Sequence, residues 1–221
     1  MKPFIVANWK CNPASLKGAK LLFDSVARGI KNVRKVEVVI CPPFIYLSNI
    51  QHLKSNIQLG GQDCFWEEKG AYTGEISPSM LKDLGVEYVI IGHSERRKYL
   101  KETDEMVNKK IEAALKQGLK PILCIDKISQ LKKDLEGVII AYEPLFAIGT
   151  GKPCSIGKAK KMRILIKKNL KMGAPILYGG SVNSQNAQDY IKKAGFQGLL
   201  VGSASLNSKE FLSIVKGIDS L

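Results

Sequence analysis

The sequence is poor in the residues that build disulfide scaffolds and metal centres. Its 221 residues include only two histidines, His52 and His93, and five cysteines, no two of which form a C-x-x-C pair. An odd number of isolated thiols suits a reducing compartment better than a disulfide framework. The usual zinc-binding spacings of histidine and cysteine are absent as well, so we expect no metal site.

Long apolar segments are also missing. The apolar run at the N-terminus, PFIVA (residues 3–7), is too short for the core of a secretory signal. No segment approaches the apolar length of a membrane-spanning helix. We therefore expect a cytoplasmic protein without a membrane partner.

Arginine is scarce although the chain is strongly basic. The 34 basic residues include five arginines, the net charge is +14, and the pI is near 9.5. The lysines are spread along the chain, and we find no arginine-rich block and no RNA-binding aromatic motif. These absences favour a solvated lysine-rich surface over a dedicated nucleic-acid partner, and the charge would attract an anionic substrate. An anion- or nucleic-acid-binding protein that uses this basic surface is the alternative.

Eight short apolar runs recur at fairly even intervals. They are FIVAN (4–8), VEVVIC (36–41), IQLGGQ (57–62), EYVIIGH (87–93), KPILCI (120–125), GVIIAYE (137–143), PILYGG (175–180) and GLLVGS (198–203). Each has the length of a strand, and most contain β-branched residues. Nearly continuous apolar character is typical of parallel strands that are covered on both faces.

Amphipathic stretches separate these runs. In residues 15–33, Leu22, Val26, Ala27 and Ile30 form one apolar stripe. Residues 103–118 begin with Thr103, carry acidic residues in the first turn and end at Gly118, which indicates a capped helix. Further helices are predicted within residues 157–173, 183–195 and 208–218.

Eight alternations of strand and helix predict a (β/α)8 TIM barrel, an α/β fold, as a single domain over residues 1–221. An open doubly wound sheet is the competing layout, but its glycine-rich dinucleotide turn is absent after the first run, where the chain reads NWKCNP. After CID (residues 124–126), only KISQLKKDLEG (residues 127–137) precedes the sixth strand. The barrel should therefore have a short fifth helix of about two turns.

Polar residues follow several predicted strands at the end where barrel enzymes place their active sites. They are Asn8 and Lys10, then His93, Ser94 and Glu95, then Glu143, and finally the small-residue turns at Gly179 to Ser181 and at Gly202 and Ser203. Small residues after the last two strands favour a phosphate site, because backbone N–H groups can bind a dianion. A carboxylate can remove a proton next to a carbonyl, while an imidazole and an ammonium stabilise the resulting enolate.

Six stretches make the sequence resemble the triosephosphate isomerase family. They are NWKCN, GAYTGEIS, IIGHSERR, AYEPLFAIGTGK, YGGSV and LLVGSASL, and they occur in the family's order over nearly the whole chain. The resemblance implies interconversion of dihydroxyacetone phosphate and D-glyceraldehyde 3-phosphate through an enediol(ate), in glycolysis and gluconeogenesis. It implies no metal and no organic cofactor. Another phosphate-binding barrel isomerase would need different acid and base residues.

The resemblance also implies roles for individual residues. Glu143 is the expected catalytic base, His93 the neutral electrophile, and Lys10 the source of positive charge beside Asn8. Glu95 is expected to orient the polar network near Lys10.

Binding of the phosphate is expected to fall to backbone groups. These are the N–H groups of Gly149, Ser181, Gly202 and Ser203.

The resemblance further implies a lid with hinges at residues 144–146 and 152–154. Closure of this lid would exclude water from the reacting centre and strengthen Glu143 as a base.

The stretch GAYTGEIS, from Gly70 to Ser77, implies a homodimer. In the family this loop reaches the neighbouring site, so Thr73 is expected near Asn8 and Lys10 of the partner subunit.

Three residues depart from the family pattern. Ser203 stands where glycine is usual, Phe146 where tryptophan is usual, and Asp126 where a glutamate is expected. We expect Ser203 to preserve phosphate binding and Phe146 to keep an apolar anchor in the first hinge. Asp126 puts the ion pairs of the barrel wall in doubt.

Overall fold

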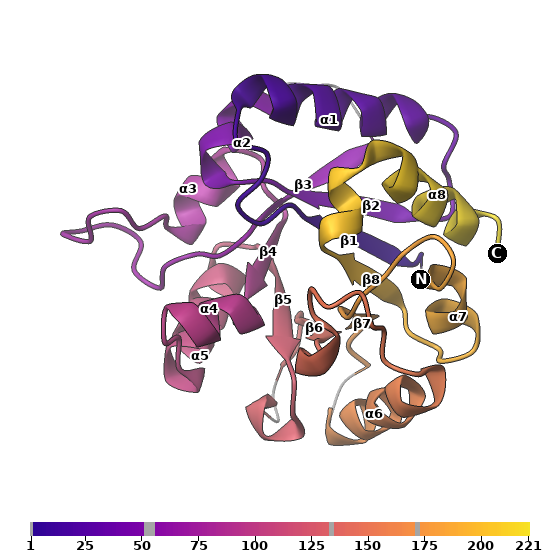
Figure 1. The fold of residues 1–221 in the computed structure, drawn as a ribbon. Coiled ribbons are helices and arrows are strands. Elements are labelled where there is room, and N and C mark those ends of the chain that lie inside the picture. The colour runs from indigo at the N-terminus through magenta and orange to yellow at the C-terminus, as the bar shows by residue number, and fades with distance from the viewer. Residues whose placement is uncertain (1, 51–55, 133–134, 171–172) are drawn as a thin grey trace.

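Eight parallel strands close into a barrel in the computed structural model, which describes residues 2–50, 56–132, 135–170 and 173–221 (Figure 1). The strands are β1 (Phe4–Asn8), β2 (Glu37–Cys41), β3 (Ile57–Gly61), β4 (Tyr88–Ile91), β5 (Lys120–Ile125), β6 (Ile139–Tyr142), β7 (Ile176–Tyr178) and β8 (Gly198–Val201). Each strand pairs with the next, and β1 pairs with β8 to close the ring. Closure confirms the barrel and excludes the open doubly wound sheet. His52 lies outside the described residues.

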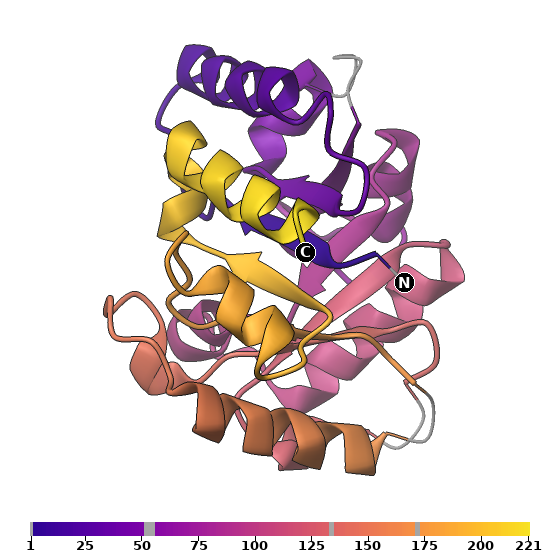
Figure 2. The same cartoon turned by 90° about the vertical axis from the view of Figure 1, so that its right-hand side faces the viewer.

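Helices surround the barrel. They are α1 (Leu16–Gly29), α2 (Phe44–Ile50), α3 (Pro78–Asp83), α4 (Ser94–Tyr99), α5 (Asp104–Lys116), α6 (Ile156–Asn169), α7 (Ala187–Lys192) and α8 (Ser208–Asp219). Figure 2 shows α1, α8, α7 and α6 as successive layers on one side, from indigo through yellow to orange. None of the helices within the described ranges is both long and apolar enough to cross a membrane.

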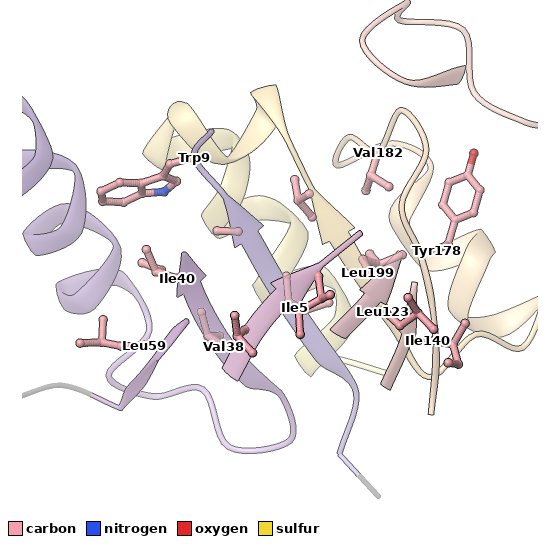
Figure 3. Close-up of a cluster of buried hydrophobic side chains, with 14 of the residues drawn as sticks. Ile5, Trp9, Val38, Ile40, Leu59, Leu123, Ile140, Tyr178, Val182 and Leu199 are labelled. Atoms are coloured by element: carbon pink, nitrogen blue, oxygen red, sulfur yellow. The ribbon is translucent and has the colours of Figure 1, made fainter. Parts of the chain in front are cut away.

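Side-chain alternation along the strands builds two apolar layers. One set of residues fills the barrel interior, for example Val39, Ile90 and Leu177. The alternate residues, including Ile5 and Ile140, face outward and pack beneath the helices (Figure 3). Strands covered on both faces explain why the apolar runs in the sequence are almost continuous.

Local capping signals place the helix ends largely as predicted. Thr103 accepts a hydrogen bond from the Met106 N–H at the start of α5, and Gly118 takes the left-handed conformation just after its end. Val26 on α1 and Ile30 at its C-cap are buried as expected, and Phe23 joins them. After β5, the described residues of the connection form the 3-10 turn η1 (Ile128–Gln130), and residues 133–134 lie outside the described ranges. The predicted end of α6 was wrong, because this helix ends at Asn169 rather than at Gly173.

The segment between β3 and α3 extends away from the barrel. Residues 62–77 form this arm, which reaches out at the left of Figure 1. Residues 70–75, near its tip, are exposed. The base of the arm is packed against the barrel, with Asp63, Cys64 and Ser77 buried, whereas the tip is open to solvent.

Candidate active site

The strand ends bring the predicted polar residues to one cavity of about 250 Å³. Its lining includes Asn8, Lys10, His93, Glu143, Gly149, Ser181, Gly202 and Ser203. Every residue predicted to contact substrate is therefore in one place. Glu95 contacts this group through Lys10.

Glu143 follows β6 directly and is almost fully buried, with 2% of its surface exposed. Its Oε1 lies 3.0 Å from His93 Nε2, and its Oε2 accepts the N–H of Ser94 at 3.1 Å. Burial raises the pKa of this carboxyl, but His93 and the Ser94 N–H together outweigh burial and hold the pKa below its ordinary value. The carboxylate is therefore charged and restrained in this structure. The expected increase in basicity would require the loss of these bonds.

His93 follows β4 and begins α4, where its ring accepts a hydrogen bond from the helix. The N–H of Glu95 donates to His93 Nδ1 at 3.2 Å. A nitrogen that accepts a hydrogen bond carries no proton, so the ring is neutral with its proton on Nε2. Nε2 faces Glu143 and the cavity.

Lys10 is held in place at both its backbone and its ammonium group. Its φ of 54° lies in the left-handed region, which is unusual for a residue other than glycine. Gln62 Nε2 donates to the carbonyl oxygens of Lys10 and Cys41, each at 2.9 Å, and Lys10 Nζ lies 2.5 Å from Glu95 Oε1. The ammonium therefore has a charged partner at the mouth of the site. Sequence reasoning missed Gln62, because nothing in its immediate pattern indicates this contact.

The loops after β7 and β8 form the other end of the cavity. Gly179, Gly180 and Ser181 follow β7, and Gly202 and Ser203 follow β8. A Cβ atom at Gly180 would overlap the hydroxyl of Tyr178, so that position requires glycine. Ser203 begins the 3-10 helix η3 (Ser203–Leu206) and is not among the described residues with positive φ. Serine is therefore accommodated there without left-handed strain.

The segment that follows Glu143 covers one side of the cavity through Ile148, Gly149 and Gly151. Both glycines have positive φ, 68° and 71°. Near its start lies the 3-10 helix η2 (Leu145–Ala147), and Ser181 Oγ donates to the Ala147 carbonyl at 2.5 Å. Phe146 is 61% exposed, so the predicted apolar anchor was wrong. Ala147, which is fully buried, occupies the interior position instead.

A second, larger cavity of about 680 Å³ lies beside the first, between α4, η1 and η2. Asp126 lines it and forms no ion pair with any residue that the structure describes, and its N–H binds Gln130. Arg97 pairs with Asp104 instead, at 2.6 Å. Among the described residues, Asp126 therefore takes no part in the ion pairs of this wall. The groups suited to proton transfer meet in the smaller cavity.

Within the described ranges, no group of three or more histidine, cysteine, aspartate or glutamate side chains is placed to hold a metal ion. The 250 Å³ cavity brings together a carboxylate, a neutral imidazole, an ammonium and backbone N–H groups.

Comparisons of the sequence and of the structure with known proteins all find the same family. A family model described as "Triosephosphate isomerase" matches residues 3–218. The triosephosphate isomerase of Alkaliphilus oremlandii (strain OhILAs) is 44% identical over 246 aligned positions, which cover 97% of this chain and 98% of the relative. That of Trichodesmium erythraeum (strain IMS101) is 43% identical, with 97% and 98% covered. A crystal structure of triosephosphate isomerase from Bartonella henselae superposes with a TM-score of 0.86 at 33% identity, covering 98% of this chain and 99% of that one.

Proposed function

The chain belongs to the triosephosphate isomerase family, and we propose that Glu143, His93 and Lys10 carry out its reaction in the 250 Å³ cavity. That reaction interconverts dihydroxyacetone phosphate and D-glyceraldehyde 3-phosphate without a cofactor, by moving a proton between adjacent carbons through an enediol(ate). The observation that carries the assignment of residues is the close approach of a buried carboxylate to a neutral imidazole at the mouth of the barrel.

Glu143 is the base in this proposal. In the free chain its oxygens bind His93 and the Ser94 N–H, which keeps its pKa low. When a substrate oxygen accepts the hydrogen bond from His93 Nε2–H, Glu143 Oε1 is freed. Rotation of the Glu143 side chain away from the Ser94 N–H frees Oε2. Burial then acts without these opposing bonds, so the pKa of Glu143 rises as the carboxylate reaches the substrate carbon.

His93 is the electrophile. Its Nε2–H can donate to each of the two substrate oxygens that exchange roles in the reaction. A neutral imidazole donates this bond without first losing a proton, and the developing negative charge strengthens the bond in the transition state.

Lys10 supplies the positive charge. Its ammonium lies against Glu95 in the free chain, and the two side chains are 28% and 41% exposed. An ion pair that is partly open to water is weak, so an arriving dianion can compete for the ammonium. Glu95 then serves as a supporting residue that holds the Lys10 ammonium beside the cavity, next to Asn8.

The phosphate end is formed by backbone groups of Gly149, Ser181, Gly202 and Ser203. Support comes from their common position at one end of the cavity. Among the described lining residues, Lys10 is the only lysine or arginine, so backbone N–H groups must supply the other contacts to the phosphate. Residues 144–154 then act as the lid. An enediolate next to a phosphate ester can expel inorganic phosphate, and a lid that restrains the intermediate suppresses that loss.

We further propose that residues 1–221 form one domain, that the chain works as a cytoplasmic homodimer in glycolysis and gluconeogenesis, and that the exposed arm is the contact. Support comes from the exposure of residues 70–75 and from the exposed apolar side chains Tyr72, Met80 and Tyr99. The alternative of an anion- or nucleic-acid-binding protein gains no support from the relatives, which are named as isomerases.

The test is a coupled assay with D-glyceraldehyde 3-phosphate, run on the unmodified chain and on Glu143→Asp. Moving the carboxylate back by one methylene should reduce turnover about a hundredfold. Glu112→Asp, on the exposed face of α5, is the matched control for the same chemical change. Equal activity of the unmodified chain and Glu143→Asp would reject Glu143 as the base.

A further inference from the structure

Two stacked tyrosines hold the residue at the end of the lid. Cys154 lies just before α6 and is 3% exposed. Its N–H donates to the hydroxyl of Tyr178 at 3.0 Å, and its carbonyl accepts from the hydroxyl of Tyr190 at 2.5 Å. Both backbone groups of this one residue are therefore bound by tyrosine hydroxyls.

The two tyrosines are themselves fixed. Their rings stack with centroids 3.7 Å apart and planes 14° apart, and Phe196 packs against both. Tyr178 and Tyr190 are 0% and 1% exposed. Tyr178 ends β7, and Figure 3 shows its hydroxyl at the tip of a ring that extends beyond the strand. A pair of buried, stacked rings has few rotamers, so the hydroxyls are rigid attachment points.

The contact of Cys154 with the two tyrosines links three separate parts of the chain. Tyr178 precedes the glycines that line the phosphate end, whereas Tyr190 lies in α7, outside the barrel. Cys154 is the last residue of the proposed lid, residues 144–154, whose Ile148, Gly149 and Gly151 line the cavity. The start of that segment is held separately, by Ser181 at Ala147. The covering segment thus has one attachment near each end, and the second one depends on α7.

We propose that Tyr190 is a positioning residue for the lid, acting through the carbonyl of Cys154 together with Tyr178. The inference deepens the proposed function and rests on it. Without the Tyr190 hydroxyl, the buried Cys154 carbonyl loses its partner, and the peptide that follows the lid can rotate toward another donor. Gly149 and Gly151 then spend less time beside the substrate, so the intermediate is less restrained.

The test begins with Tyr190→Phe, which keeps the ring stack and removes only the hydroxyl. Loss of one hydrogen bond of ordinary net strength predicts a fall of about tenfold in kcat/KM. The fraction of turnovers that release inorganic phosphate should rise several-fold, since a looser lid permits elimination of phosphate from the enediolate. Tyr178→Phe should act in the same direction. The double variant should lose less than the product of the two single losses, because both hydroxyls hold one residue.

Tyr88→Phe is the matched control. Tyr88 is equally buried and its hydroxyl also has a partner, Glu37, but both residues begin their strands at the barrel end opposite the site. Tyr88→Phe should therefore leave phosphate release unchanged.

Two results would overturn the inference. One is a Tyr190→Phe variant with the kcat/KM and phosphate release of Tyr88→Phe. The other is a loss of thermal stability without any rise in phosphate release, which would make Tyr190 merely structural. Failure of the proposed function is distinguishable, because the unmodified chain would then show no isomerase activity in the same assay.

Discussion

His93 Nε2 and Glu143 Oε1 lie 3.0 Å apart, and neither side chain is more than 7% exposed. The acceptor bond at His93 Nδ1 assigns the ring proton to Nε2, so this contact joins a neutral imidazole to a charged carboxylate. Both groups are held in the geometry of the free chain by the N-terminal backbone of α4, through the N–H groups of Ser94 and Glu95. Substrate must therefore separate the pair before either group can act on it.

Replacing Lys10 tests the role of the ammonium. Lys10→Met keeps the length of the side chain and should lower kcat/KM about a hundredfold or more, as for loss of one transition-state donor in a closed site. Steady-state kinetics with both triose phosphates measures this. Lys17→Met, on the exposed face of α1, removes the same charge and should leave kcat/KM within about twofold, since it acts only through the screened overall field. Similar losses in the two variants would contradict a specific role for Lys10.

Ser203→Gly tests whether serine disturbs the phosphate end. Because Ser203 is not in the left-handed region, glycine relieves no strain there, and KM should change by less than about threefold. Isothermal titration with inorganic phosphate gives an independent measure of the same site. A glycine variant that binds far more tightly would show that serine obstructs the anion.

Asp63 should make stability depend on pH. It lies with Glu102, Lys110 and Arg96 in a buried ionic cluster, where burial raises its pKa to about 6. An acid whose pKa is raised on folding destabilises the fold while it is charged, so the penalty applies above about pH 6 and fades as pH falls toward the unfolded value near 3.8. The neutral variant Asp63→Asn should then gain about 3 kcal/mol in the free energy of unfolding at pH 8, and almost nothing at pH 4.

Urea denaturation at both pH values measures this difference. Lys110→Met is the informative contrast, because it leaves two buried carboxylates with Arg96 alone and should destabilise by about 3–5 kcal/mol. A destabilised Asp63→Asn at pH 8 would mean that the charged form of Asp63 is the favoured one.

The exposed arm tests the proposed dimer. Thr73→Arg places a long charged side chain near the tip of the arm and should convert a dimer into monomers, with a fall in kcat/KM. Analytical ultracentrifugation measures the mass. Asn169→Arg, at the exposed end of α6, adds the same side chain elsewhere and should stay dimeric. A Thr73→Arg variant that remains dimeric would remove the arm from the interface.

The barrel was predictable from the sequence because its strands are covered on both faces. Burial on both faces makes runs such as EYVIIGH almost continuously apolar, and all eight runs proved to be strands. Helix ends followed where a cap was visible, as at Thr103 and Gly118. The end of α6 was missed because the chain there continues with lysines and apolar residues and offers no cap.

The groups that line the cavity were predictable from their places after the strands, but the bonds that restrain them were not. Gln62 holds Lys10 across 52 positions, and Tyr190 reaches Cys154 across 36. Such contacts depend on how distant segments pack, which local patterns do not encode. For Phe146 the sequence predicted a contact that the structure lacks: this aromatic residue was expected to anchor the first hinge, but its side chain is exposed.

Transfer of a carbon-bound hydrogen to Glu143 is the central claim, and isotope exchange tests it most directly. The chain and Glu143→Gln are incubated with dihydroxyacetone phosphate in D₂O, and ¹H NMR follows deuterium entering the carbon positions. We predict that the unmodified chain incorporates deuterium during turnover and that Glu143→Gln does so about a thousandfold more slowly, within the range for loss of a positioned general base. Incorporation by Glu143→Gln at the unmodified rate would show that another group removes the proton.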